Sequence, residues 1–140
     1  MHWILLPYRR YFDFSGRSSR REFWLFFAVQ ILALLVLASW ICEVLTEIGR
    51  QGVTGHSVET FAELIGPAFT AFGIFSLVTL IPALAVQVRR LHDQNLSALL
   101  MLVHLVPGIG SLLMLILMGI RGTNGSNRYG PDPLANTRRH

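Results

Sequence analysis

The sequence has 140 residues, of which 52% are hydrophobic and only 14% are charged, against about 25% charged residues in ordinary soluble domains. This composition excludes a soluble globular protein and predicts a single membrane domain over residues 1–140. The net charge of +4 comes from arginine alone, and the arginines stand at the ends of apolar runs, so we expect them to orient helices in a membrane and not to bind nucleic acid.

Residues 1–19 form the first expected element, an interfacial basic and aromatic segment. Ile4, Tyr8, Tyr11 and Phe12 follow the spacing of one helix face. An amphipathic stretch rich in Trp, Tyr and Arg beside a spanning helix is typical of the membrane interface. The segment is either an anchor that sets the depth of the next helix or a partner-binding site, and we favour the anchor.

A first spanning helix is predicted over residues 20–42. Ser19 and Glu22 have the S-x-x-E spacing of a capping box, and the uncharged run from Phe23 to Cys42 has 20 residues. About 20 apolar residues are needed to cross the hydrocarbon. The run exceeds the ~7–15-residue core of a signal peptide and no small-residue cleavage site follows it, so we interpret it as a retained helix. Because Cys42 is the only cysteine, an internal disulfide and a thiolate metal cluster are excluded.

The next stretch, residues 43–63, is predicted to be an acidic loop. It contains four glutamates, three glycines and one arginine, whereas the N-terminal segment up to Arg21 contains five arginines. Positive charge marks the cytoplasmic side of a membrane. We therefore expect a cytoplasmic N-terminus and an extracytoplasmic loop, in which His56 is a solvated residue.

Two further uncharged runs, Leu64 to Val88 and Leu96 to Ile120, have 25 residues each and predict helical segments over residues 64–90 and 96–120. Pro107-Gly108 divides the third run near its middle, so this run either spans the membrane or turns back. A turn would return the polar tail, residues 121–140, to the cytoplasm. The tail has four arginines against Asp132 alone, which agrees with that side. We favour an all-α, multi-pass membrane protein whose third run is bent or re-entrant.

Three motif blocks surround these runs: Tyr11 to Trp24 (YFDFSGR running into SRREFW), Val88 to Asp93 (VRRLHD) and Gly122 to Pro133 (GT, then NRYGPDP). Together and in this order they resemble the bacterial inner-membrane family called domain of unknown function 805, the YhaH-like proteins. The resemblance covers the chain from about Tyr8 to Pro133. It implies a small helical protein of the bacterial inner membrane without an established activity.

The polar residues of the three blocks form the candidate site. We expect them to meet on the cytoplasmic side, with carboxylates paired to arginines and with Arg17, Arg20, Arg21, Arg89 and Arg90 on anionic lipid headgroups. The predicted lipid-headgroup or polar cluster consists of Arg17, Arg20, Arg21, Glu22, Arg89, Arg90, His92, Asp93, Asn127, Arg128 and Asp132.

Two histidines have alternative interpretations. His92 with Asp93 has the chemistry of a proton-transfer pair or of metal ligands, but no second cluster with ligand spacing accompanies it. We favour a structural role, in which Asp93 or Asn95 ends one helix and caps the next. His104 is ionisable inside an apolar run and so is a functional candidate by default, although we favour a neutral histidine bonded to a backbone carbonyl. We predict no catalytic, cofactor or metal site.

Two classes of function remain open. The first is a non-catalytic scaffold or regulatory component whose arginine-rich cytoplasmic face binds lipid headgroups or a membrane protein, with a homo-oligomer as one form of that partner. The second is a subunit of a small oligomeric transporter or channel. A transporter should place polar groups near the middle of the membrane, and only Gln30, Ser76, Thr79 and His104 qualify. We favour the first class, and a lipid-modifying enzyme ranks third.

Overall fold

A computed structural model describes residues 2–51 and 58–135. The described residues form helices and contain no strand, apart from a single bridge between Asn127 and Gly130 that closes a turn in the tail. This confirms the all-α prediction. The elements are α1 (His2–Arg9), α2 (Arg20–Gln51), α3 (Val58–Asp93), the 3-10 helix η2 (Ala98–Leu105) and α4 (Ile109–Gly119).

The chain divides into two compact units. Unit 1 comprises Met1–Phe27 with Ile81–His140, and unit 2 comprises Ala28–Leu80. Helices α2 and α3 each begin in one unit and end in the other.

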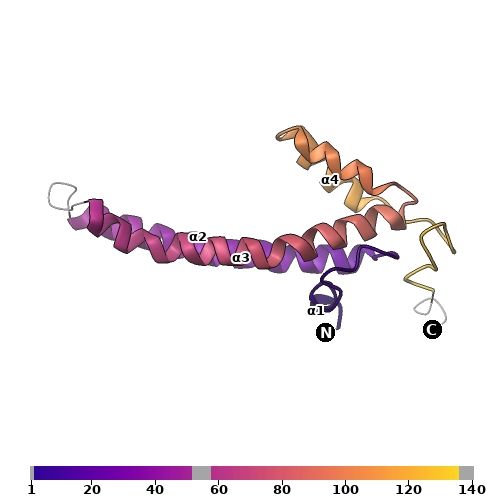
Figure 1. The fold of residues 1–140 in the computed structure, drawn as a ribbon, viewed down its shortest axis with the longest axis horizontal. Coiled ribbons are helices and arrows are strands. Elements are labelled where there is room, and N and C mark those ends of the chain that lie inside the picture. Colours follow the sequence, from indigo (N-terminus) through magenta and orange to yellow (C-terminus); the bar gives the residue numbers. More distant parts are fainter. Residues whose placement is uncertain (1, 52–57, 136–140) are drawn as a thin grey trace. The chain divides into compact units, whose positions relative to one another are not determined.

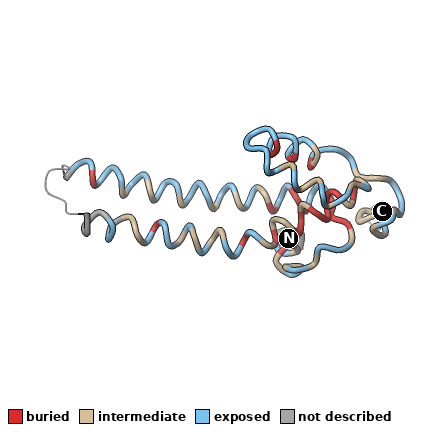
Figure 2. The backbone as a smooth tube through the Cα atoms, turned by 45° about the horizontal axis from the view of Figure 1, so that its top comes forward, coloured by how far each residue is buried: buried red, intermediate tan, exposed pale blue. Residues whose placement is uncertain are grey.

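Unit 2 is a hairpin of two long apolar helices that lie side by side (Figure 1). Both α2 and α3 are long and apolar enough to cross a membrane, yet only 6% of the most apolar window of α2 and 22% of that of α3 are buried. Figure 2 shows the hairpin almost entirely in the colours of exposed and intermediate residues. The core helix of a soluble protein would bury these side chains, whereas lipid accepts them without cost. The chain is therefore a membrane protein.

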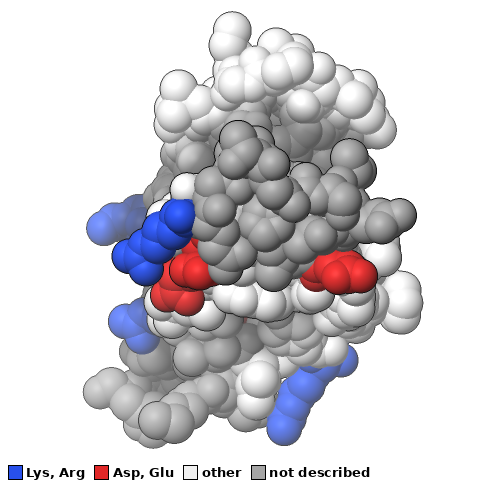
Figure 3. Space-filling model, turned by 90° about the vertical axis from the view of Figure 1, so that its left-hand side faces the viewer, with Lys and Arg blue, Asp and Glu red and all other residues white. Residues whose placement is uncertain are grey.

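The helices extend well beyond the predicted 20–42 and 64–90. Residues 43–51 continue α2 and residues 58–63 begin α3, so most of the predicted acidic loop is helical. Gly49 lies within α2 and does not end it. The exposed acidic residues at this end thus lie on helices, and Figure 3 shows acidic side chains beside the residues drawn in grey. His56 lies outside the described residues.

The third apolar run does not form one helix over residues 96–120. It is split into η2 and α4, which pack against each other. Gly108 makes the turn with a φ of 75°, a conformation that glycine adopts without strain. Gly110 allows the close approach, since a Cβ there would overlap the backbone carbonyl of Val103. The bend at Pro107-Gly108 follows from these two glycines, and neither piece is long enough to span a bilayer alone.

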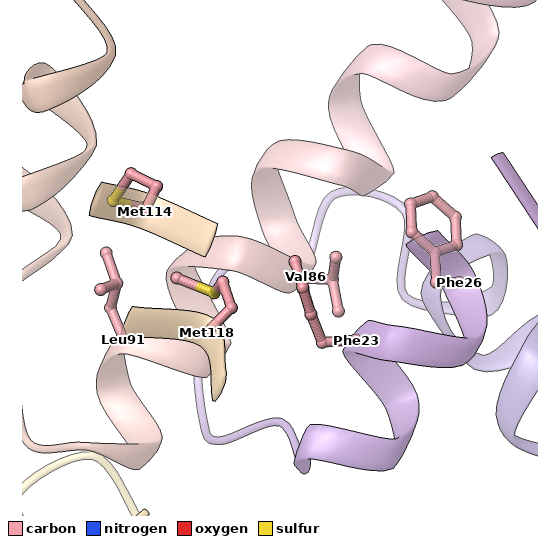
Figure 4. Close-up of a cluster of buried hydrophobic side chains, with 6 residues drawn as sticks. All are labelled: Phe23, Phe26, Val86, Leu91, Met114 and Met118. Atoms are coloured by element: carbon pink, nitrogen blue, oxygen red, sulfur yellow. The ribbon is translucent and has the colours of Figure 1, made fainter. Parts of the chain in front are cut away.

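A small apolar core packs α4 against the start of α2 and the end of α3 within unit 1. It is formed by buried side chains from these three helices (Figure 4): Phe23, Phe26, Val86, Leu91, Met114 and Met118. The two methionines are four residues apart and so share one face of α4. This core sets the positions of the first turn of α2 and the last turn of α3, which carry the polar residues described next.

The interfacial segment is helical only as far as Arg9. Tyr8 packs its ring against Phe26, with the ring centroids 5.5 Å apart. Tyr11 and Phe12 lie beyond the end of α1, and Phe12 is 75% exposed. The predicted helix face over residues 4–12 is therefore wrong in its second half, because the chain leaves the helix to reach α3.

Candidate functional site

Buried polar residues gather in unit 1, where residues 10–19, the end of α3 and the tail meet. Five of them, called the motif cluster here, are Arg17, Glu22, Arg89, Arg90 and Asp93, and none is more than 6% exposed. They come from all three motif blocks, and Figure 2 shows the buried segments concentrated in this part of the chain. Burying charge is costly unless every charge is paired and hydrogen-bonded.

The Asp93 carboxylate is paired with two arginines. Arg17 donates to its Oδ1 from Nε at 2.9 Å and from Nη2 at 2.8 Å, and Arg90 Nη1 pairs with its Oδ2. The Asp93 backbone carbonyl also accepts the amide of Thr123 at 2.8 Å. One residue thus links the N-terminal block, the end of α3 and the tail.

Arg17 is the other link to the tail. Its Nη1 donates to the Gly125 carbonyl and its Nη2 to the Thr123 carbonyl, the latter at 2.6 Å. The tail lies so close that a Cβ on Gly122 would overlap the Asp93 carboxylate. The planar guanidinium suits this task, because it offers several donors in fixed directions.

Arg90 caps the end of α4. The last carbonyls of a helix have no partner within it, and here Arg90 Nε donates to the Met118 carbonyl at 3.2 Å while its Nη2 reaches the Ile120 carbonyl. Gln94 donates to the Leu117 carbonyl in the same way. Arg90 therefore orders the return of the third apolar run.

Arg89 holds the N-terminal block against α3. Its Nη2 lies 3.2 Å from Glu22 Oε1, and its Nη1 donates to the carbonyls of Arg10, at 3.3 Å, and Asp13. Ser19 Oγ accepts the Glu22 amide at 3.2 Å, as the capping-box spacing predicts. The Glu22 carboxylate pairs with Arg89 of α3 and not with the Ser19 amide, as a complete capping box would require. A buried carboxylate needs a countercharge more than it needs this hydrogen bond.

Asn95 ends α3. Its φ is +61°, its amide bonds the His92 carbonyl at 3.0 Å, and the Leu96 amide bonds the Leu91 carbonyl at 2.9 Å. These two bonds form a Schellman motif, in which asparagine is the common substitute for glycine. Ser97 caps η2 by accepting the Leu99 amide at 3.3 Å. The expectation that Asp93 or Asn95 would also cap the next helix is thus wrong.

His92 takes part in docking the tail. Its ring stacks on Tyr129, with centroids 3.8 Å apart and planes 7° apart, and its Nδ1 lies 3.3 Å from the Gly16 carbonyl. Asn127 Nδ2 donates to the His92 carbonyl at 2.9 Å, and Arg128 donates to the Asn95 carbonyl at 2.9 Å. The side chains of Asn127 and Arg128 thereby donate hydrogen bonds to backbone carbonyls at the end of α3.

This arrangement separates the suspected proton-transfer pair. His92 faces Gly16 and Tyr129, while both carboxylate oxygens of Asp93 are engaged by arginines. Over residues 2–51 and 58–135 no group of three or more His, Cys, Asp or Glu side chains could hold a metal ion. His104 is bonded to the side chain of Gln87, with His104 Nε2 3.0 Å from Gln87 Oε1, so the expected backbone partner is wrong.

Three exposed arginines complete the site. Arg20, Arg21 and Arg121 make no hydrogen bond or ion pair within the described part of the chain. Among the five arginines expected on lipid headgroups, Arg17, Arg89 and Arg90 are buried against protein groups, so only Arg20 and Arg21 have the exposure that such contact requires. The sequence reasoning missed Arg121, although its position directly after an apolar run is a signal for an interfacial cation.

Arg20 and Arg121 border a polar cleft of about 370 Å³ in unit 1. The cleft lies against the same part of the tail that Arg17 holds, and Asp132 of the predicted cluster also borders it. The remaining lining residues are Asp93, Gly122, Thr123, Asn124, Pro133 and Leu134. All eleven predicted site residues lie in unit 1. The five residues of the motif cluster are buried and paired, three arginines are exposed and three residues are half-buried. The exposed ones are Arg20, Arg21 and Arg128, and the half-buried ones are His92, Asn127 and Asp132.

Proteins of Escherichia coli are similar to this chain in sequence. The chain is 35% identical over 133 residues to Inner membrane protein YhaH of Escherichia coli (strain K12), covering 95% of this chain and 97% of YhaH. It is 31% identical to Inner membrane protein YhaI of the same strain, covering 95% and 96%, and 31% identical to Uncharacterized protein YiiR, with 86% of each chain covered. No solved structure matches.

The family model described as "Protein of unknown function (DUF805)" matches residues 11–131. This range contains the whole motif cluster and all but the last two residues of the third motif block. A match over most of the chain, together with full-length relatives in the inner membrane of Escherichia coli, shows that this chain is a membrane protein of the DUF805 family.

Proposed function

We propose that this protein is a non-catalytic component of the bacterial inner membrane, a scaffold or regulatory subunit whose arginine-rich cytoplasmic face contacts lipid headgroups or another membrane protein. Helices α2 and α3 cross the membrane, and the hairpin of η2 and α4 enters it only from the cytoplasmic side. The observation that carries the proposal is the division of the arginines: Arg17, Arg89 and Arg90 are buried in ion pairs, whereas Arg20, Arg21 and Arg121 are exposed.

The buried group is poorly suited to chemistry. A general acid or base must reach its substrate, but Glu22 is 2% exposed and Asp93 is 5% exposed, and each is paired with arginine. The exposed group suits recognition, because guanidinium groups at a membrane surface bind phosphates and carboxylates. The largely exposed apolar surfaces of α2 and α3 leave room for a second copy or another membrane protein beside them.

The absence of lysine from the chain allows a sharp test. We expect Arg21→Lys and Arg121→Lys to preserve charge while introducing one amine each for a membrane-permeable amine cross-linker in intact cells. Arg50→Lys, at the opposite end of α2, is the matched control. Discrete adducts with a protein or an amine-bearing lipid from positions 21 and 121, but not from 50 or the unmodified chain, would support the proposal. The same adducts from all positions, or none, would contradict it.

One observation favours the second class, a subunit of an oligomeric transporter or channel. The polar pair of His104 and Gln87 lies within otherwise apolar segments, and His104 is exposed. Polar groups facing lipid are expensive and often mark a helix contact or a pathway. Our proposal predicts no proton or solute flux through the purified protein in liposomes and no effect of His104→Leu. A flux that this variant abolishes would reverse the ranking of the two classes.

A further inference from the structure

The polar cleft meets an apolar groove at Arg20. The groove has a volume of about 560 Å³ and is lined by Arg20, Arg21, Trp24, Leu25 and Gly119. Arg20 lines both the groove and the cleft, and Gly119 of the groove is two residues from Arg121 of the cleft. Both volumes fall within the range of about 300–1,000 Å³ that is usual for ligand sites. A polar compartment thus adjoins an apolar one at the arginine-rich end of α2.

The cleft has an excess of positive charge. Its two carboxylates are already engaged: Asp93 pairs with both Arg17 and Arg90, and Asp132 accepts the backbone amide of Leu134 at 2.9 Å. Arg20 and Arg121 have no ion pair within the described residues. Four arginines in and beside the cleft thus face two carboxylates, and this excess of positive charge favours an anionic ligand.

We propose that the cleft and the groove together bind one anionic phospholipid. Arg20 and Arg121 hold its phosphodiester, as guanidinium groups do through paired hydrogen bonds. An acyl chain lies along Trp24 and Leu25, where an interfacial tryptophan is favourable. This inference deepens the lipid contact in the proposed function and depends on that part of it alone.

Both compartments are needed to select a lipid over other phosphates. Inorganic phosphate or glycerol phosphate would use only the cleft, since it has no apolar part for the groove. A zwitterionic phosphatidylcholine would bring a quaternary ammonium beside the two arginines without a hydrogen-bond donor for the cleft. An anionic phospholipid is therefore the ligand that fits the charge and the shape together.

Trp24 can report occupancy directly, because it lines the groove and is 40% exposed. In a Trp3→Phe, Trp40→Phe background it is the only tryptophan. We would reconstitute this protein twice in the same mixture of phosphatidylcholine and phosphatidylglycerol. In the first sample the phosphatidylglycerol carries brominated acyl chains, and in the second the phosphatidylcholine carries them. The ratio of quenching measures the relative occupancy of the groove. We expect about a fivefold preference for phosphatidylglycerol.

Neutral substitutions separate the site from diffuse surface attraction. Arg20→Gln and Arg121→Gln should each lower the preference to about twofold or less, and Arg20→Lys should keep most of it. Arg50→Gln, at the opposite end of α2 and outside both compartments, should keep at least half of the preference. Circular dichroism and gel filtration in detergent would verify that each variant is folded.

Three results would overturn the inference: equal quenching by the two lipids, a loss in Arg50→Gln as large as in Arg20→Gln, or relief of the quenching by millimolar glycerol phosphate. The last would assign the cleft to a soluble phosphate. None of these results would affect the protein adducts from positions 21 and 121. The lipid site can thus fail while the proposed function stands, and the reverse also holds.

Discussion

Asp93 receives a countercharge from two arginines that belong to different segments of the chain. Arg17 lies 76 residues away in sequence, whereas Arg90 lies on the preceding turn of α3. All three side chains are almost fully buried. Replacing one partner of such a group leaves an uncompensated buried charge, which is the most damaging way to alter an ion pair.

We predict that Asp93→Asn lowers the free energy of unfolding by about 3–5 kcal/mol. The two guanidinium groups would lose their countercharge while remaining buried. Thermal unfolding in detergent, followed by circular dichroism, measures the change. The matched control is Glu47→Gln, whose exposed side chain lies 4.0 Å from Arg50 and should change stability by less than about 1 kcal/mol. Equal effects of the two substitutions would show that the motif cluster does not stabilise the fold.

Asp13 lies outside the spanning helices and has an unusually low pKa. The hydroxyl of Ser15 donates to its Oδ1, Arg10 donates to its Oδ2 at 2.8 Å, and together they lower the pKa of Asp13 to about 2. Because the folded pKa is below the unfolded value of about 3.9, this carboxylate stabilises the fold above pH ~4. That contribution is lost as the pH falls from ~4 through ~2.

We expect Ser15→Ala to raise the pKa of Asp13 towards about 3.9, since the largest stabilising hydrogen bond is removed. Ser15→Thr retains the hydroxyl and should leave the pKa low. A carbon-13 titration of the Asp13 carboxyl in micelles gives both values. An unchanged pKa in the alanine variant would mean that Ser15 does not bond Asp13 in solution.

At the scale of elements, the return of the third apolar run depends on one close contact. Gly110 of α4 approaches the backbone of Val103 in η2 with no room for a methyl group. We predict that Gly110→Ala separates the two helices and costs about 1–3 kcal/mol, as overpacking does elsewhere.

Gly119→Ala provides the comparison for this contact, because nothing lies within 4 Å of a Cβ at position 119. It should leave the midpoint of thermal unfolding in detergent unchanged or raise it slightly. If Gly110→Ala proved as harmless as Gly119→Ala, η2 and α4 would not be packed as a hairpin.

At the scale of the whole molecule, the bend bears on which side of the membrane the C-terminus lies. The tail is bonded to the N-terminal block through Arg17, Thr123 and Gly125, and both belong to unit 1. Two spanning helices and a hairpin that turns back would leave both termini on one side. From the distribution of arginine we expect that side to be the cytoplasm.

We predict that reporter fusions at His140 behave like fusions at the N-terminus. Fusions that are active only in the cytoplasm should be active at both ends, and fusions that are active only outside should be silent at both. A fusion between residues 52 and 57 is the positive control for the outer side. An external signal from the C-terminal fusion would contradict the shared face and would make the third run a third span.

Much of this architecture is predictable from local sequence patterns. The uncharged runs predict the spanning helices, Ser19 with Glu22 predicts the start of α2, and Pro107-Gly108 predicts the bend. The ends of the helices were harder to place, because Glu43, Glu47 and Arg50 suggested a polar loop. A helix that continues into water carries charged side chains without penalty. The first charged residues after an apolar run therefore mark where the hydrocarbon ends and not where the helix ends.

The sequence by itself determined that this chain is a membrane protein, where α2 begins, and which polar residues form the candidate site. Length, hydropathy and capping are local properties, and they can be judged without knowing the neighbours. Only the tertiary structure decided which arginines are buried and which are exposed. Arg17 and Arg20 are three residues apart and chemically identical, yet one is buried against Asp93 and the other lines an open cleft. Their difference depends on segments 76 and 101 residues further along the chain, because burial and pairing arise only when distant segments pack together.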